Sequence, residues 1–282
     1  MLIRKQDVGV LLLYYLGYSR IRNLVLRLQR KAVARFVMFH DILPEAVGSF
    51  RDNVQFLKRR TNVVSLDDFL AGRLSSKKIN VVITFDDGYK SWITGAIPLL
   101  KKLKLPATFF VSSGLVGLPK EDETEIMRSK LLIKPPIQIT SGALSFEDVK
   151  KIAEEGFGVG GHTLTHCNLA HSRDIVQVRY EITEDKERLE RLTGSKIEYF
   201  SYPFGGHHNQ DINLIQILGE SGYRAAVTTV SGFNCAKSDP FLLHRELTYA
   251  WMHGWVFRAR AYGNYDAVRF LRQGILKSLF WT

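Results

Sequence analysis

An apolar run that ends in two adjacent aspartates constrains this chain more than any other feature. Residues 79–85 (INVVITF) are rich in β-branched side chains, and Asp86 and Asp87 follow at once. A run without polar alternation is typical of a parallel strand that is covered on both faces. Two neighbouring buried carboxylates raise each other's pKa unless they are paired or bind a metal. The sequence therefore predicts a buried parallel strand with a functional group at its carboxyl end.

Segments with strand and helix character alternate on both sides of this run. Further strands are expected at 35–39, 62–65, 107–111, 157–160, 197–202, 225–229 and 241–244. Helices are expected at 50–59, 97–103, 175–192 and 211–221, after Leu66, and from Ser145 to Gly156. Residues 114–142 lack such a pattern, and we interpret them as an insertion or long loop. The alternation predicts an α/β fold with a parallel sheet or barrel.

The basic residues are concentrated at the two ends of the chain. The formal net charge is +11, but residues 1–36 carry eight basic side chains against Asp7 alone. Residues 253–282 carry five against Asp266 alone, which leaves no net charge in the middle. A nucleic-acid-binding domain needs a basic groove on its folded surface. The charge distribution therefore argues against a nucleic-acid partner.

Residues 8–30 are predicted to form a basic amphipathic helix, or a helix pair with a break near Gly17. Apolar residues recur at helical spacing in the second half, with four arginines between them. Such a segment binds a membrane interface, or packs on the domain with its arginines in water. We divide the chain into an N-terminal segment (1–33), an α/β domain (34–250) and a basic aromatic C-terminal segment (251–282). The C-terminal aromatics either contact lipid or cover the lower face of the barrel.

The predicted location is cytoplasmic, at the inner face of a membrane. No run of 18 apolar residues is present, and the two cysteines are too few for a disulfide scaffold. Val8–Leu16 resembles a signal-peptide core and Ala32-Val33-Ala34 a cleavage site, but the stretch between them is rich in arginine. The alternative is a chain that is exported or anchored by its N-terminus.

Polar side chains stand at the ends of several predicted strands. Asp86-Asp87, His162, Pro203-Phe204 and His244 each follow an apolar run. Carboxyl ends of parallel strands converge on one rim, where barrels and open sheets place their sites. His162 and His166 lie four residues apart, so both imidazoles can reach one point. With one carboxylate they match a catalytic zinc-type site that keeps a position for water.

Three motifs follow one another along the chain: Thr84-Phe85-Asp86-Asp87-Gly88, Gly161-His162-Thr163-Leu164-Thr165-His166 and Phe200-Ser201-Tyr202-Pro203-Phe204-Gly205. Together they resemble the motifs of the polysaccharide deacetylases (carbohydrate esterase family 4, the NodB homology domain). The similarity covers roughly residues 35–248. It implies a distorted (β/α) barrel with about seven strands.

The resemblance also implies a role for each matching residue. Asp86 would be the general base, and Asp87, His162 and His166 would bind a divalent metal, with zinc as the expected ion. The backbone N–H of Phe204 would hold the oxyanion, and Pro203 and Tyr202 would shape the substrate groove.

The chain departs from the family pattern at two positions. Many members have an arginine that orients the catalytic aspartate where Ser201 stands. The family's general acid is a histidine after a late strand, which makes His244 the candidate, although Arg245 follows it where an aspartate is common. His207 and His208, in the loop after the third motif, are alternatives, and His40 is expected to line the pocket.

The resulting prediction is an N-deacetylase that acts on amino sugars of a glycan or a polyprenyl-linked precursor. One alternative is an O-acetyl esterase acting on a polysaccharide. Another is a catalytically inactive carbohydrate-binding relative, which the presence of all four metal and base residues argues against.

Overall fold

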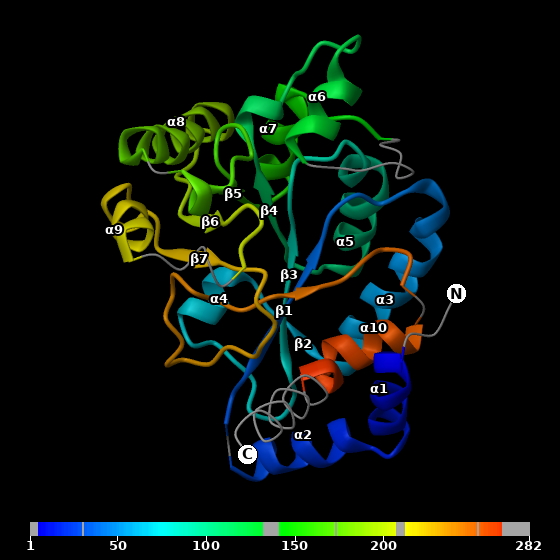
Figure 1. Cartoon of the computed structure of the whole chain (residues 1–282). Coiled ribbons are helices and arrows are strands. Elements are labelled where there is room, and N and C mark those ends of the chain that lie inside the picture. Colours follow the sequence, from blue (N-terminus) through cyan, green and yellow to red (C-terminus); the bar gives the residue numbers. More distant parts are fainter. Residues whose placement is uncertain are drawn as a thin grey trace.

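A curled parallel sheet forms the centre of the molecule (Figure 1). The computed structural model describes residues 5–29, 31–131, 141–172, 174–206, 212–252 and 254–266. The strands are β1 (Ala34–Phe39), β2 (Asn62–Val63), β3 (Asn80–Phe85), β4 (Thr108–Val111), β5 (Gly158–Gly161), β6 (Tyr199–Ser201), β7 (Ala225–Val227) and β8 (Glu246–Leu247). Their order is β7-β6-β5-β4-β3-β1-β8, with β2 paired to β3 off this path. The predicted distorted (β/α) barrel of about seven strands is confirmed.

Helices surround the sheet. They are α1 (Lys5–Tyr15), α2 (Tyr18–Leu28), α3 (Val47–Arg60), α4 (Leu66–Leu70), α5 (Ile97–Leu103), α6 (Glu123–Lys130), α7 (Phe146–Glu154), α8 (Ile175–Thr193), α9 (Ile212–Glu220) and α10 (Gly254–Ala261). Helix α7 has Ser145 as its N-cap, as the predicted start at this residue requires, and Asp148 completes a capping box. Gly194 ends α8 in the left-handed conformation. No described helix has the length and apolar content needed to cross a bilayer.

The two central strands fix the level of the site. β1 and β3 are buried along their whole length and pair from Ala34–Asn80 to Phe39–Phe85. Stacked aromatic rings of Phe39, Phe85 and Phe109 fill the space beneath their carboxyl ends, with centroids 5.5 and 4.6 Å apart. His40 and Asp86, which follow Phe39 and Phe85, therefore lie at the same level of the sheet, directly above a closely packed core.

One irregular segment connects the two edges of the sheet. Leu243 forms an isolated parallel bridge with Val227 of β7, and β8 then pairs with Val37 and Met38 of β1. The predicted strand at 241–244 is therefore wrong. Phe241 and Leu242 donate backbone hydrogen bonds to Asp239, so the start of that apolar run is a turn. Regular pairing begins only at Glu246.

Two helices were not expected from the sequence. Helix α6 lies inside residues 114–142, which we interpreted as an insertion or long loop, and α10 lies in the C-terminal segment. The expected break between α1 and α2 is confirmed at Gly17, whose φ is 78°. The division of the chain at residues 33 and 250 stays a prediction.

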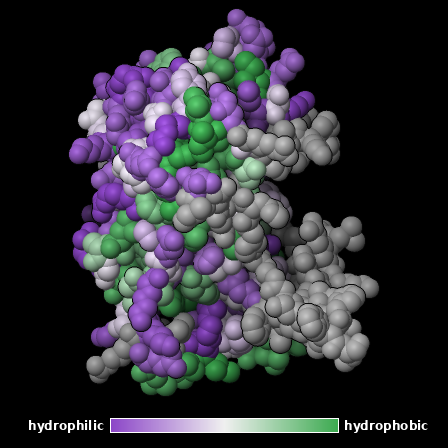
Figure 2. All heavy atoms as spheres, turned by 60° about the vertical axis from the view of Figure 1, so that its left-hand side comes forward, coloured by the Kyte–Doolittle hydropathy of each residue, from purple (hydrophilic) through white to green (hydrophobic). Residues whose placement is uncertain are grey.

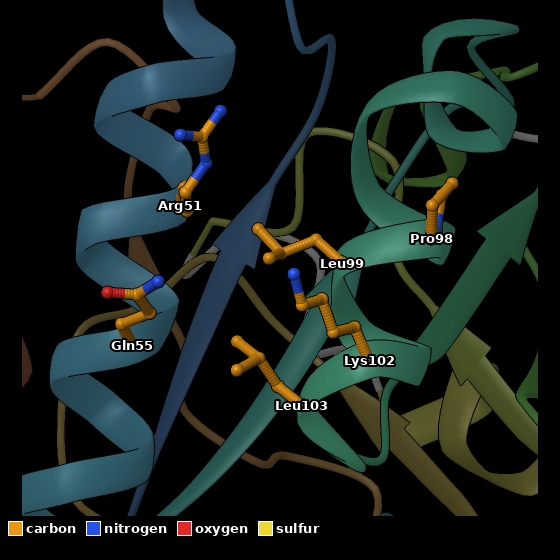
Figure 3. Close-up of a pocket in the computed structure, with 6 residues that line it drawn as sticks. All are labelled: Arg51, Gln55, Pro98, Leu99, Lys102 and Leu103. Atoms are coloured by element: carbon orange, nitrogen blue, oxygen red, sulfur yellow. The ribbon is translucent and has the colours of Figure 1, made fainter.

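A groove on the outer helical layer lies between α3 and α5 (Figure 3). Arg51 and Gln55 line it from α3, and four residues line it from α5: Pro98, Leu99, Lys102 and Leu103. It shares no residue with the predicted site.

Candidate active site and metal centre

Asp87, His162 and His166 meet at the carboxyl ends of β3 and β5. The Nε2 atoms of both histidines lie 3.3 Å from Oδ1 of Asp87, and all three side chains are buried. Asp87 and His166 have positive φ angles of 90° and 56°. Such backbone is unfavourable for residues other than glycine, so the surrounding structure holds these side chains in place. The predicted ligands are thus brought together.

The hydrogen bonds of the two imidazoles leave Nε2 free to bind a cation. Nδ1 of His162 lies 2.7 Å from the carbonyl oxygen of Ser201, and Nδ1 of His166 lies 3.0 Å from that of Lys130. A carbonyl oxygen only accepts, so Nδ1 carries the proton in each ring. The Nε2 lone pairs then point toward Asp87. Two imidazole nitrogens and a carboxylate fit a divalent metal such as zinc.

Helix α8 holds the loop that carries the two histidines. Asp185 accepts hydrogen bonds from the backbone N–H groups of Ser113 and His162, both at 2.8 Å. Glu181 accepts from the backbone and the hydroxyl of Thr165, at 2.9 and 2.8 Å. Both acids are buried. They hold the loops of the candidate metal site and are not part of the Asp87-His162-His166 set.

Asp86 is held by an arginine that the sequence analysis did not assign. Nη1 and Nη2 of Arg245 donate to its two carboxylate oxygens, both at 2.6 Å. The Ser201 hydroxyl donates to Asp86 at 3.0 Å and accepts from Arg245 at 2.8 Å. Arg245 also donates to the Thr228 carbonyl. The orienting arginine expected at Ser201 is therefore replaced by Arg245, which reaches the same carboxylate from the opposite edge of the sheet.

The local charges favour the ionised forms of both aspartates. Burial alone would raise the pKa of Asp86, but the Arg245 guanidinium and His162 lower it below its ordinary value. Burial opposes ionisation of Asp87 as well, yet His40 and hydrogen bonds from the two histidines, in their form protonated at both ring nitrogens, bring its pKa well below the usual range. Burial lowers the pKa of His162, but Asp87 and Asp86 outweigh this effect and raise it. The pair of acids is compatible with two charges because each has its own positive partner.

The candidate proton donors lie in different surroundings. His40 follows β1, and its charge acts on both Asp86 and Asp87. Its Nδ1 is buried and makes no hydrogen bond among the described residues. The ring of His244 packs against Gly232. A Cβ added to Gly232 would lie only 2.8 Å from Cδ2 of His244. His207 and His208 lie outside the described residues.

The third motif forms a turn beside the metal ligands. Pro203 and Tyr202 are buried, and the Tyr202 hydroxyl donates to the Phe241 carbonyl. Phe204 is 38% exposed with a φ of 57°, and its ring lies 4.8 Å from that of His166. This contact places the predicted oxyanion turn next to the ligand triad.

Tyr89 is a further site residue that the sequence analysis missed. It is buried, and burial together with the Asp87 carboxylate raises its pKa well above the usual value. The phenol therefore keeps its proton beside the metal ligand. Its position two residues after Asp87 was the only signal in the sequence.

A curled parallel sheet with an Asp-His-His set and a second, arginine-paired aspartate at its carboxyl rim defines a NodB-like α/β protein. Residues 73–226, more than half of the chain, match the family described as polysaccharide deacetylase. The chain belongs to this family.

The related proteins carry deacetylase names. YxkH of Bacillus subtilis (strain 168), named for the same family, is 27% identical over 179 residues, which are 64% of this chain and 55% of YxkH. The chitooligosaccharide deacetylase of Azorhizobium caulinodans is 25% identical over 152 residues, 53% of this chain and 59% of that protein. The chain thus spans between half and two thirds of the length of these relatives.

Solved structures share the fold. IcaB from Ammonifex degensii has a TM-score of 0.64 at 23% identity and covers 82% of this chain and 97% of its own. The Streptococcus pyogenes deacetylase PplD, solved with acetate, has a TM-score of 0.61 at 21% identity, over 79% and 95% of the two chains. At this identity the likeness concerns the fold alone.

Proposed function

We propose that this chain removes N-acetyl groups from the amino sugars of a glycan by metal-dependent hydrolysis. The observation that carries the proposal is the buried Asp87-His162-His166 set directly beside Asp86, which Arg245 keeps charged. The names of the relatives, a chitooligosaccharide deacetylase among them, agree with this chemistry. A polyprenyl-linked sugar is the alternative substrate, and the inner face of a membrane stays the predicted location.

Asp86 is proposed as the general base. A divalent ion held by the triad would act as a Lewis acid toward the acyl carbonyl and lower the pKa of a water molecule. Arg245 and Ser201 fix the orientation of the Asp86 carboxylate, and each carboxylate oxygen can accept more than one hydrogen bond. Asp86 can therefore receive a proton from the attacking water while it stays paired. The N–H of Phe204 would donate to the oxyanion.

A protonated histidine must then release the amine. His244 is the candidate from the sequence, whereas the geometry supports His40. β1 and β3 end level with each other, so His40 and Asp86 leave the sheet side by side, and the backbone N–H of Asp86 donates to the Phe39 carbonyl. We propose His40 as the donor because its Nδ1 is buried without a partner among the described residues, close to the charges of both aspartates.

Exposed aromatic rings at the same rim support a sugar substrate. β8 runs parallel to β1 with Leu247 opposite Met38, so Tyr249 comes level with the end of β1, where His40 lies. The rings of Tyr249 and Trp251 stack 5.2 Å apart at 10° and are 38% and 51% exposed. Flat aromatic faces next to a polar site suit the apolar face of a sugar ring.

The test of the base is Asp86→Asn, assayed for acetate release on free and lipid-linked N-acetyl sugars and on O-acetylated polysaccharide. Turnover on the N-acetyl substrates should fall by about 10²-fold or more while the metal content is unchanged, since the base and not a ligand is lost. Unchanged turnover would exclude this mechanism. Faster release from the O-acetyl substrate by the wild type would identify an esterase.

The two histidines are separated by comparing His40→Ala with His244→Ala. The first should lose the basic limb of the pH profile of kcat and at least about 10²-fold in turnover, because the amine then leaves without a proton. The second should keep the wild-type profile. The opposite pattern would assign the acid to His244.

A further inference from the structure

Helix α2 presents its apolar face to solvent. Ile21, Leu24, Val25 and Leu28 follow the three- and four-residue spacing of one helix face, and they are 64%, 56%, 43% and 76% exposed. In a surface helix of a globular protein such a stripe packs against the core. Figure 2 shows an apolar band along the lower edge of the molecule, the level at which Figure 1 places α2.

The polar face of α2 is bound to the protein. The Ser19 hydroxyl donates to the side chain of Asn264, and Arg22 donates to the carbonyl of Tyr262. The Arg22 guanidinium also lies 4.4 Å from the centre of the Phe233 ring. These contacts hold the face that usually meets water, so the outward orientation of the apolar stripe is built into the fold.

Helix α1 extends the exposed apolar surface. Leu12, Tyr15 and Leu16 are 60%, 72% and 68% exposed, and Val10 is buried with Ala259 and Tyr265, which ties α1 to the body of the protein. Of the fourteen large apolar side chains that are exposed in the described part of the chain, seven lie within residues 12–28. We call the seven the apolar stripe: Leu12, Tyr15, Leu16, Ile21, Leu24, Val25 and Leu28.

The positive charge of the N-terminal residues indicates which kind of partner covers the apolar stripe. Residues 1–36 carry eight basic residues and one acid, and α2 contains no acidic residue. The sequence of α2 instead contains three arginines, Arg20, Arg22 and Arg27. A second copy of this chain would bring two strongly basic segments together, which is unfavourable. An anionic lipid surface offers both an apolar layer and the opposite charge.

We propose that α1 and α2 bind the surface of an anionic lipid bilayer through the apolar stripe. Helix α2 leads into the amino end of β1, whereas the metal ligands lie beyond the carboxyl ends of β3 and β5. β1 has six residues, which span about 20 Å. The bound protein would therefore hold its site away from the bilayer, where it can meet the outer residues of a long glycan rather than a sugar at headgroup level.

The test is flotation of the full chain with vesicles of phosphatidylcholine alone or mixed with phosphatidylglycerol. The wild type should float with the mixed vesicles only, and added salt should release it. Leu24→Ser with Leu28→Ser should weaken this binding roughly tenfold or more. The matched control is Ile175→Ser with Val176→Ser on α8, which are 52% and 75% exposed and outside the stripe. The control should float like the wild type.

Three results would overturn the proposal. One is a wild type that binds neither vesicle, and another is equal loss of binding in the stripe and control variants. The third is a dimer, seen by light scattering without lipid, that the stripe variant separates. Flotation needs no turnover, so the result does not depend on the deacetylase activity. Hydrolysis of a soluble oligosaccharide should be the same in all three proteins.

Discussion

The charge on Asp86 depends on residues that come from three different strands of the sheet. Asp86 follows β3, Ser201 ends β6 and Arg245 precedes β8, and the three side chains form a closed set of hydrogen bonds. Removing one partner of a buried ion pair leaves an uncompensated charge. The family position at Ser201 and the position at Arg245 therefore offer two routes by which a guanidinium can reach the same carboxylate.

Exchanging the two side chains tests this equivalence. Arg245 lowers the pKa of Asp86, so Arg245→Ser should raise it, shift the acidic limb of kcat/KM to higher pH and reduce turnover by about 10²-fold. Adding Ser201→Arg to that variant should recover part of the activity and return the limb toward the wild-type pH. Ser201→Arg alone, the control, should unfold at lower temperature because it buries a second cation. A wild-type pH profile in Arg245→Ser would contradict this role.

Local spacing is why the ligands could be predicted and the arginine could not. Asp86 and Asp87 are adjacent, and His162 and His166 are four residues apart, so the sequence itself shows each half of the centre. Arg245 lies 159 residues from Asp86, and only the closure of the sheet brings them together. The sequence order of His244 and Arg245 made the histidine the candidate for the general acid. In the folded protein it is the arginine side chain that contacts Asp86.

At the scale of elements, α8 holds the loop that carries His162 and His166 through two buried acids, and we call this pair of acids the clamp. Asp185 and Glu181 lie one helical turn apart and take three N–H groups and one hydroxyl from two loops. The sequence predicted a helix at residues 175–192, but not that its buried face would carry acids. Buried carboxylates are costly unless they accept several hydrogen bonds. The position of the candidate metal ligands therefore depends on a helix that contributes no residue to the Asp87-His162-His166 set.

Asp185→Asn should weaken this clamp. An amide has one acceptor oxygen, so a backbone N–H of Ser113 or His162 loses its partner, at a cost of about 1–3 kcal/mol in unfolding free energy. Burial raises the pKa of Asp185 to about 6, so the stability that its proton contributes is present below pH 4 and is lost as the pH rises through 6. The stability difference between wild type and variant should therefore shrink over that range. Metal affinity should also fall by about tenfold.

Denaturant unfolding at several pH values and metal titration measure these effects. Glu187→Gln, at an exposed position on the same helix, is the control and should change neither quantity. Equal stability of Asp185→Asn and wild type at all pH values would show that the clamp contributes nothing.

At the scale of the whole molecule, the two ends of the barrel have different roles. The carboxyl ends of the strands carry the candidate metal ligands, the proposed base and the exposed Tyr249–Trp251 pair. The amino end of β1 connects to α2 and the apolar stripe. The net charge of +11 suggests a basic protein, but its location in the sequence already separates a neutral catalytic middle from basic ends. What the sequence could not show is that the apolar face of α2 points outward, since periodicity does not reveal which face a helix buries.

Metal binding should stabilise the whole fold, because the ligands tie together elements far apart in the chain. Asp87 follows β3, and the two histidines follow β5, 75 and 79 residues later in the chain. A ligand that binds only the folded state adds about 2.7 kcal/mol at a concentration 100 times its Kd, so chelation should lower Tm by several degrees and added Zn²⁺ should restore it. A metal ion binds the neutral form of imidazole. Because the pKa of His162 is raised, protons compete with the metal for this ring already at pH values above the ordinary pKa of histidine. The stabilisation by Zn²⁺ should therefore begin to decrease at a pH above about 6.5, the ordinary pKa of histidine, and fall further as the pH is lowered. Calorimetry of the chain with and without chelator measures both effects. Asp86→Asn should respond to Zn²⁺ like the wild type and Asp87→Asn should not; the same response in both variants would place the ion elsewhere.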